Sequence, residues 1–390
     1  AYSTALEQLD QALEVARSHN KARVLEAALL RRSGSAEAAR CALEELLAYD
    51  PLDHWGRFEA ALLAGDEDFG EALELSRNDA QTMLDLAFDY ADAGLWAEAR
   101  RVLEVHHAHP VAAVAVPNPL GRTPMTRYAL AWIHARSGDE AGAEAALAEA
   151  RAQPPDHFFP SRLHEQLVLE WALARGPDPL AGYALGNLLY DRRRHEEAIA
   201  AWERSAQEGA PCATVHRNLG LALWNVRRDG PGAREAYAQA RRHDPCDARL
   251  LYELDQLRKK LDDPPAERLA ALEAERELAL ERDDASVELA TLLNLCGRHG
   301  DALELLLSRR FHPWEGGEGA VLRQYRAARL GLGRAALAEG DAATALRHFE
   351  QALEPPPELG EAWHPLQARA DVSYWQGRAL RDLGREDEAR

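Results

Sequence analysis

The chain has 390 residues and a formal net charge of −19, with 65 acidic against 46 basic side chains. A surface that binds nucleic acid needs a concentrated basic face, so this balance argues against DNA or RNA as a partner. No run of about 18 apolar residues occurs, and the first residues do not resemble a signal peptide, so we expect no membrane segment. The four cysteines show no close pairing, which favours a reducing, cytoplasmic location.

A pattern of small residues recurs along the chain. An alanine stands in the same local frame eight times, and twelve residues before each (thirteen in one case) lies another alanine or a glycine. Five residues before six of these alanines lies a glycine, and arginine takes that place before the other two. This order is typical of two antiparallel helices that touch backbone to backbone. The eight frame alanines are Ala39, Ala99, Ala143, Ala198, Ala233, Ala302, Ala345 and Ala389.

A large apolar residue stands four positions after seven of these alanines, on one face of the second helix of each pair. Prolines then end the helices, as Pro51, Pro211 and Pro245 do. No segment alternates polar and apolar residues over the length of a strand. We therefore predict an all-α, right-handed α-solenoid of stacked antiparallel helix pairs, in one continuous domain over residues 1–390. The large residues are Leu43, Leu103, Leu147, Trp202, Tyr237, Leu306 and Phe349.

Regular repeats and irregular segments alternate in chain order. The regular repeats are expected near residues 23–51, 80–110, 124–155, 179–211, 213–245, 286–310, 326–357 and 370–390. Degenerate helical pairs are expected near 52–78 and 249–283, and insertions at 106–124, 154–178 and 311–319. An extra helix is expected within the second insertion, at 161–174.

Three histidines, His106, His107 and His109, open the first insertion. Histidines this close suggest a metal site, but no companion ligand follows at the spacing of a structural site. Their place at the end of a helix instead suits a capping role beside the helix dipole. The chain also lacks Gly-rich phosphate loops, metalloprotease motifs and nucleophile elbows. We therefore expect no metal, no cofactor and no enzymatic activity in this chain.

The clearest copies of the repeat lie at 185–211 and 219–245. Gly186 and Asn187 precede Trp202 in the first copy, and Pro211 and Pro245 are 34 residues apart. Here the chain resembles the tetratricopeptide repeat (TPR) family. That resemblance implies a helical solenoid whose first helices line a concave groove for a peptide or protein partner.

A narrower resemblance concerns the strings at 182–191, 215–220, 247–257 and 311–319. They look like one family of large bacterial proteins, in which a helical-repeat region follows an N-terminal β-rich domain similar to sugar-binding sandwich folds. The resemblance implies that this chain is the C-terminal part of a longer polypeptide. Its start at Ala1, without methionine, fits that expectation.

Asn187, Asn218 and Arg249 take the ninth, sixth and second places of three successive repeats. In some TPR proteins these places, together with basic residues at the fifth and sixth, clamp the C-terminal carboxylate of a peptide. Here Tyr183 and Glu253 stand where two basic residues belong, so a complete clamp is not expected. We predict that the polar floor of the groove is formed by Tyr183, Asn187, His216, Asn218 and Arg249.

The loop at 311–319 is the most unusual stretch of the chain. Trp314 offers a flat face of the kind that stacks on a sugar or a cation. His312, Glu315 and Glu318 form a compact titratable set, so these three are also candidates for acid–base chemistry. Alternatively, Phe311 and Trp314 fill the joint between two repeats, and Glu318 faces the start of the next helix.

Two functions follow from these patterns. The first is an interaction scaffold that binds a peptide, or a partner domain of the same polypeptide, in its groove. The second is an accessory region of a carbohydrate-acting protein, in which the loop at 311–319 contributes to a sugar site. The narrower family resemblance, not the fold, is what raises the second alternative.

Overall fold

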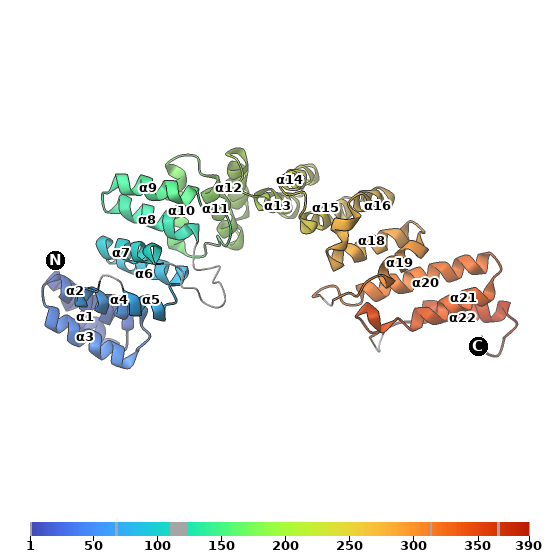
Figure 1. Ribbon diagram of the computed structural model, residues 1–390, viewed down its shortest axis with the longest axis horizontal. Coiled ribbons are helices and arrows are strands. Elements are labelled where there is room, and N and C mark those ends of the chain that lie inside the picture. Colours follow the sequence, from blue (N-terminus) through green and yellow to red (C-terminus); the bar gives the residue numbers. More distant parts are fainter. Residues whose placement is uncertain (1, 67–68, 110–122, 313, 365–366, 390) are drawn as a thin grey trace. The chain divides into compact units, whose positions relative to one another are not determined.

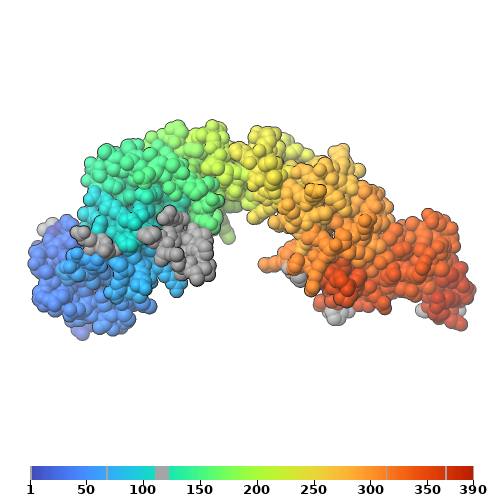
Figure 2. Space-filling model, viewed as in Figure 1, coloured from blue at the N-terminus to red at the C-terminus, as the bar shows by residue number. Residues whose placement is uncertain are grey.

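The computed structural model describes residues 2–66, 69–109, 123–312, 314–364 and 367–389. Every regular element within these ranges is a helix and none is a strand, so the all-α prediction is confirmed. The chain divides into two compact units, residues 1–215 and 216–390, and the division falls inside α13 (Ala213–Ala222) (Figure 1). Side chains pack into a continuous body within each unit (Figure 2).

Unit 1 holds twelve helices before α13 in its described residues. They are α1 (Tyr2–Val15), α2 (Asn20–Arg32), α3 (Ala36–Tyr49), α4 (His54–Ala64), α5 (Gly70–Leu75), α6 (Ala80–Asp92), α7 (Trp96–Ala108), α8 (Pro124–Arg136), α9 (Glu140–Arg151), α10 (Leu163–Ala174), α11 (Pro179–Asp191) and α12 (His195–Gln207). Neighbours in sequence pack as pairs, namely α2 with α3, α6 with α7, α8 with α9 and α11 with α12.

Unit 2 begins within α13 and continues through a π-helical turn, η2 (Leu223–Arg227). The remaining elements are α14 (Gly230–His243), α15 (Ala248–Lys260), α16 (Pro265–Ala274), α17 (Arg276–Leu280), α18 (Asp283–Leu295), α19 (His299–Leu307), α20 (Ala320–Ala338), α21 (Ala342–Leu353), the 3₁₀ turn η3 (Pro357–Leu359) and α22 (Ala370–Asp382). Here α18 packs with α19, and α20 with α21.

In each regular pair, the first helix carries the early small residue and the second helix carries the frame alanine. Seven frame alanines, all except Ala389, are completely buried. At three early glycines, Gly186, Gly220 and Gly333, an aromatic ring occupies the space that a side chain would take. A Cβ at Gly186 would lie 2.3 Å from Nε1 of Trp202, and one at Gly333 would lie 2.3 Å from Cε1 of Phe349.

The turns between paired helices need a left-handed residue. All six glycines of the repeated frame have positive φ, between 74° and 85°, for example 85° at Gly138. Arg193 and Arg228, which take the glycine's place in two repeats, adopt the same region at 61° and 55°. The next helix is then often capped by aspartate, as Asp139 accepts from the Gly142 N–H at 2.9 Å.

The irregular segments also take helical form. α4 and α5 occupy 54–75, α15 to α17 occupy 248–280, and α10 is the extra helix of the second insertion. The end of the chain differs from expectation, because residues 386–389 form turns and the final frame alanine stands on no second helix. Among the described residues, no helix combines the length and apolar character that a membrane crossing needs.

Candidate functional site

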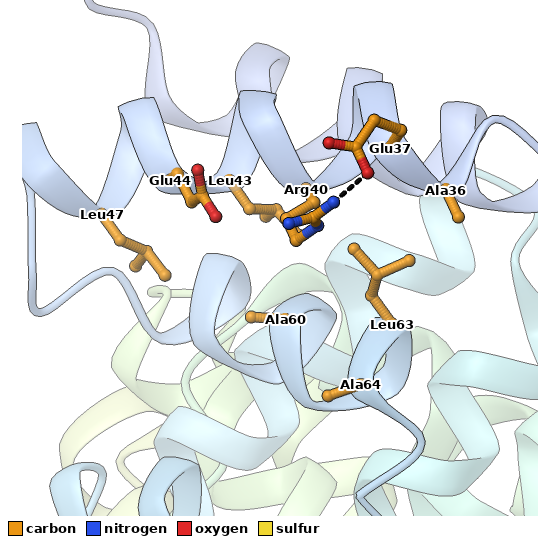
Figure 3. A pocket seen from close by; sticks show the side chains of 9 residues that line it. All are labelled: Ala36, Glu37, Arg40, Leu43, Glu44, Leu47, Ala60, Leu63 and Ala64. Atoms are coloured by element: carbon orange, nitrogen blue, oxygen red, sulfur yellow. Dashed lines mark hydrogen bonds and ion pairs between the residues drawn. The ribbon is translucent and has the colours of Figure 1, made fainter.

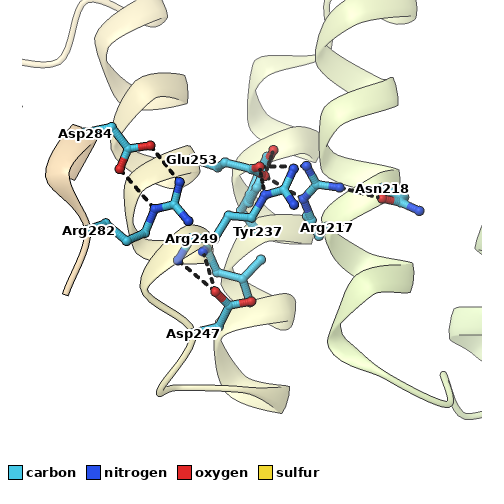
Figure 4. A network of polar contacts seen from close by, with 9 residues as sticks. Arg217, Asn218, Tyr237, Asp247, Arg249, Glu253, Arg282 and Asp284 are labelled. Carbon is cyan, nitrogen blue, oxygen red and sulfur yellow. Dashed lines mark hydrogen bonds and ion pairs between the residues drawn. The ribbon is translucent and has the colours of Figure 1, made fainter. Parts of the chain in front are cut away.

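The first helices of unit 2 carry a polar network beside a small cavity. Arg217 of α13 donates two hydrogen bonds to the carboxylate of Glu253 of α15, from Nε at 2.7 Å and from Nη2 at 2.6 Å. Arg249, one helical turn before Glu253, adds a third bond at 2.8 Å. The Tyr237 hydroxyl donates to the same carboxylate at 3.2 Å (Figure 4). One carboxylate therefore joins α13, α14 and α15.

Burial and hydrogen bonding have opposite effects on the pKa of the carboxylate in this network. Burial works to raise the pKa of Glu253, but the hydrogen bonds from Arg217 and Arg249 outweigh it and hold that pKa below its usual value. Burial and the charge of Glu253 raise the pKa of Tyr237, so its hydroxyl remains a donor. Glu253 is thus ionised at neutral pH and occupies both arginines.

Two predicted floor residues belong to this network. Asn218 accepts from Nη1 of Arg217 at 3.1 Å, and Arg249 is bound to Glu253 as described. His216 lies one residue before Arg217 and is 9% exposed, with its ring 4.9 Å from that of His243. Arg217 and Tyr237 were not among the residues that the sequence pattern predicted for the groove floor. The four-residue spacing of Arg249 and Glu253 was the available signal for their ion pair.

The other two predicted floor residues lie on α11 in unit 1. Tyr183 is 6% exposed, and its backbone oxygen accepts the indole N–H of Trp202 at 3.2 Å. Asn187, one turn later, is half-buried. These two residues therefore share one helix face, while His216, Asn218 and Arg249 lie in unit 2.

The cavity beside the network has a volume of about 170 Å³. Trp224 and Asn225 enter it from the π-helical turn η2, and Gln256 and Lys260 enter it from α15. Tyr237 and Glu253 line it as well, so the cavity and the network share a wall. Aromatic rings, two amides and a lysine at one opening suit a ligand with both apolar groups and hydrogen-bonding groups.

The position of η2 has a cause in the sequence. In the other repeats the frame alanine lies twelve positions after the small residue, but in this repeat it lies thirteen positions after it, from Gly220 to Ala233. In the neighbouring repeats the turn is closed by a bond across five residues, as from Arg194 N–H to the Leu189 carbonyl. Here Asp229 N–H reaches back six residues to the Leu223 carbonyl. The additional residue is absorbed as a π turn, and this places Trp224 and Asn225 at the cavity.

Unit 1 contains a different, mainly apolar groove of about 610 Å³ between α3 and α4. The two helices approach closely near Gly56, where a Cβ would lie 2.8 Å from Cδ2 of Leu46. Toward the start of α3 and the end of α4 they enclose the groove, with Leu43 and Leu63 in its wall and the ion pair of Glu37 and Arg40 at its edge (Figure 3). Nothing in the described residues indicates what would cover it.

The loop at 311–319 is packed as a joint. Phe311 is 1% exposed and belongs to the core of unit 2, and Trp314 packs against the same core. The backbone of Gly317 lies directly on the indole of Trp314, because a Cβ there would come within 1.9 Å of Cε2. One face of the tryptophan is therefore covered by its own loop. Pro313 lies outside the described residues.

The titratable side chains of this loop, those of His312, Glu315 and Glu318, are exposed to solvent. His312 is highly exposed, and its backbone N–H donates to Asp283 at 2.8 Å. Glu315 and Glu318 are both exposed. The carboxylate at the start of α20 is that of Glu361, which accepts from Gly319 N–H at 3.1 Å, whereas the sequence suggested Glu318 for that place.

The histidines of the first insertion have protein partners. Nδ1 of His106 lies 2.7 Å from Oδ1 of Asn78, and Nε2 of His107 lies 3.0 Å from the hydroxyl of Thr126. Nδ1 of His109 lies 3.1 Å from the Val105 carbonyl, at the end of α7. In the described part of the chain no group of three or more His, Cys, Asp or Glu residues is placed to hold a metal ion. The rest of the insertion, 110–122, lies outside that part.

The helix pairs define this chain as an all-α repeat protein, and comparisons with known proteins add little beyond that. No protein-family model matches the chain. It is similar to YrrB, described as a TPR protein with an unusual peptide-binding site, at 20% identity over 48% of this chain and 91% of YrrB, with a TM-score of 0.36. It is also similar to yeast Tom70, at 13% identity over 100% of this chain and 85% of Tom70, with a TM-score of 0.30. TM-scores this low say nothing about where or what this chain binds.

Proposed function

We propose that this chain is a non-enzymatic interaction scaffold that binds an extended peptide segment across the first helices of unit 2. The bound segment belongs to a partner protein or to another domain of the same polypeptide. The observation that carries the proposal is the cavity between η2 and α15, where aromatic and amide side chains converge on a rigid helical frame. Extended peptides are held in this way, by side-chain pockets and by hydrogen bonds to their backbone.

The cavity offers separate contacts for the two parts of a peptide. Trp224 and Tyr237 provide aromatic walls for an apolar side chain. Asn225 and Gln256 each carry a donor and an acceptor, which match the N–H and C=O of a peptide backbone. The binding contribution of such contacts is modest individually, so several must act together.

The network beside the cavity argues against recognition of a terminal carboxylate at this place. Arg217 and Arg249 already bind Glu253, so a peptide carboxylate would have to displace an internal one. Displacement would leave the partly buried Glu253 without its partners, which is costly. We therefore propose that the network holds α13 against α15. The side-chain amides of Asn225 and Gln256 then form the hydrogen bonds to the bound peptide.

The carbohydrate alternative gains no support from the loop at 311–319. Gly317 covers one face of Trp314, and the ring packs against the core of unit 2. The catalytic roles considered for His312, Glu315 and Glu318 have no supporting geometry, and a cytoplasmic location remains a prediction.

A selection from a random peptide library on the full chain tests the proposal. We expect enriched peptides to lose roughly thirtyfold in affinity when Asn225→Ala and Gln256→Ala are combined, since two hydrogen bonds of about 1 kcal/mol each are removed. Gln239→Ala, on the second helix α14, is the matched control and should change affinity less than about twofold. The proposal fails if no peptide is enriched, or if the control weakens binding as much as the cavity variant.

A further inference from the structure

Helix α20 differs in charge from the rest of this acidic chain. Its 19 residues contain four arginines and no aspartate or glutamate. Arg323 and Arg334 are eleven residues apart, which is about three helical turns, so they share one face and stand roughly 16 Å apart along the axis. Arg326 pairs with Asp371 at 3.6 Å, which leaves Arg323 and Arg334 as the arginines of this face in a protein with net charge −19. A face of this kind favours an anionic partner.

This face borders a cleft of about 580 Å³ between α20 and α22. Arg334 and Leu337 line it from α20, and Trp375 and Arg378 line it from α22. The Arg334 guanidinium lies over the Trp375 ring, 5.1 Å from its centroid. Arg334 and Arg378 both occupy the ninth place of their repeats, directly after the small residues Gly333 and Gly377, so the repeat directs both to the same side.

Neither arginine of the cleft has a carboxylate partner. In the described part of the chain, no aspartate or glutamate oxygen lies within 4 Å of the charged nitrogens of Arg334 or Arg378, although Asp382 lines the same cleft. By contrast, Arg217, Arg268 and Arg309 each bind a carboxylate of this chain at 2.7 Å or less. Two exposed arginines with no internal carboxylate partner leave N–H donors available to an external anion.

The histidine that lines the cleft is neutral. His299 of α19 lies against Gly331, where a Cβ would come within 2.2 Å of Cδ2 of its ring. Burial lowers the pKa of His299, and the positive charge of Arg334 lowers it further. The imidazole is therefore uncharged at neutral pH, and the positive charge of the cleft comes from its arginines.

We propose that the cleft between α20 and α22 binds an acidic segment of a partner protein. Two side-chain carboxylates of that segment bind Arg334 and Arg378, and an apolar side chain between them packs on Trp375 and Leu337. The segment continues along α20 toward Arg323. This surface is separate from the η2 cavity, and it adds a second contact to the proposed scaffold.

Fluorescence anisotropy with synthetic labelled peptides tests this proposal on the full chain. The probe alternates glutamate and leucine and has blocked ends, so that no terminal carboxylate is present. We expect it to bind, and its affinity to fall at least fivefold in the Arg334→Gln, Arg378→Gln double variant, because charged hydrogen bonds are lost. Raising the salt from about 50 to about 300 mM should weaken it as well.

Control variants and control peptides distinguish binding in the cleft from nonspecific electrostatic attraction to the protein. Arg381→Gln, three residues further on α22 and outside the cleft, removes the same charge and should leave affinity within about twofold. The proposal is overturned if the acidic peptide does not bind, if a peptide with lysine for glutamate binds equally well, or if Arg381→Gln weakens binding as much as the double variant. Binding of a phosphoserine peptide without binding of the glutamate peptide would also overturn it. These variants leave the η2 cavity intact, so failure here is distinguishable from failure of the scaffold proposal.

Discussion

At the scale of single residues, two side chains in each repeat are matched in size: the early small residue and the large residue four places after the frame alanine. The early small residue is alanine wherever the residue four places after the frame alanine is leucine, and glycine where that residue is Trp202, Tyr237 or Phe349. At Gly220, a Cβ would lie 2.7 Å from Cδ2 of Tyr237. The combined volume of each contact is thus kept nearly constant, as close packing requires.

This size matching predicts that alanine in place of the early glycine destabilises the protein, which is opposite to the usual effect of that substitution in a helix. Alanine in place of a helix-interior glycine normally stabilises a protein by about 1 kcal/mol. We expect Gly186→Ala to lower the free energy of unfolding by about 2 kcal/mol instead, because the Trp202 ring is buried and held by its bond to Tyr183. In a Trp202→Leu background the same substitution should be neutral or stabilising. Urea unfolding followed by far-UV circular dichroism measures both changes.

A turn glycine provides the control. Gly138→Ala meets no atom within 4 Å and costs only the strain of a positive φ, about 1 kcal/mol, whatever residue stands at 202. If Gly186→Ala destabilised the Trp202→Leu protein as much as the parent, the size matching would be refuted.

His216 gives a prediction about pH. Burial lowers its pKa, and the neighbouring His243 and Arg242 lower it further, so the folded protein resists protonation there. The unfolded chain then binds more protons, and the stability present above about pH 6.5 decreases as the pH falls below that value. We expect the free energy of unfolding to fall between pH 7.5 and 5.5, and His216→Gln to reduce this fall. An unchanged slope in the variant would contradict the assignment.

At the scale of elements, much of the fold followed from sequence spacing. The all-α class was predictable because small residues and turn glycines recur at fixed distances, and Gly138 shows the left-handed turn that its place implies. The network of Arg217 and Glu253 was not predictable, because it joins residues 36 apart on helices whose facing sides depend on packing. The capping of α20 by Glu361 was missed for the same reason, since it lies 42 residues from Gly319.

The π turn η2 was visible in the sequence only as an additional residue, not as a site. Deletion of Asn225 restores the twelve-residue spacing from Gly220 to Ala233. We expect the deleted protein to remain helical, with a melting temperature within a few degrees of the parent, because an α turn replaces the π turn. It should no longer bind the selected peptides, since Trp224 is rotated away from the cavity. Asn225→Ala, which keeps the π turn, should retain part of the affinity; equal loss in both variants would show that the turn geometry is irrelevant.

At the scale of the whole molecule, the first helices carry chemically different side chains over one repeated frame. The ninth place of the repeat holds Phe88 and Trp132 in unit 1, and Arg334 and Arg378 in unit 2. The second helices supply the buried alanines and large residues that hold each pair together. The ninth place thus changes from a buried phenylalanine at Phe88 to exposed arginines at Arg334 and Arg378, while the buried frame is kept.

Hydrogen exchange of the full chain with and without a selected peptide tests this division most directly. If the first helices of unit 2 form the binding face, the bound peptide slows exchange of the backbone amides in η2 and α15, which border the cavity. Exchange on the side of α14 that faces away from the cavity stays unchanged. Protection confined to α14, or found in second helices alone, would contradict the account.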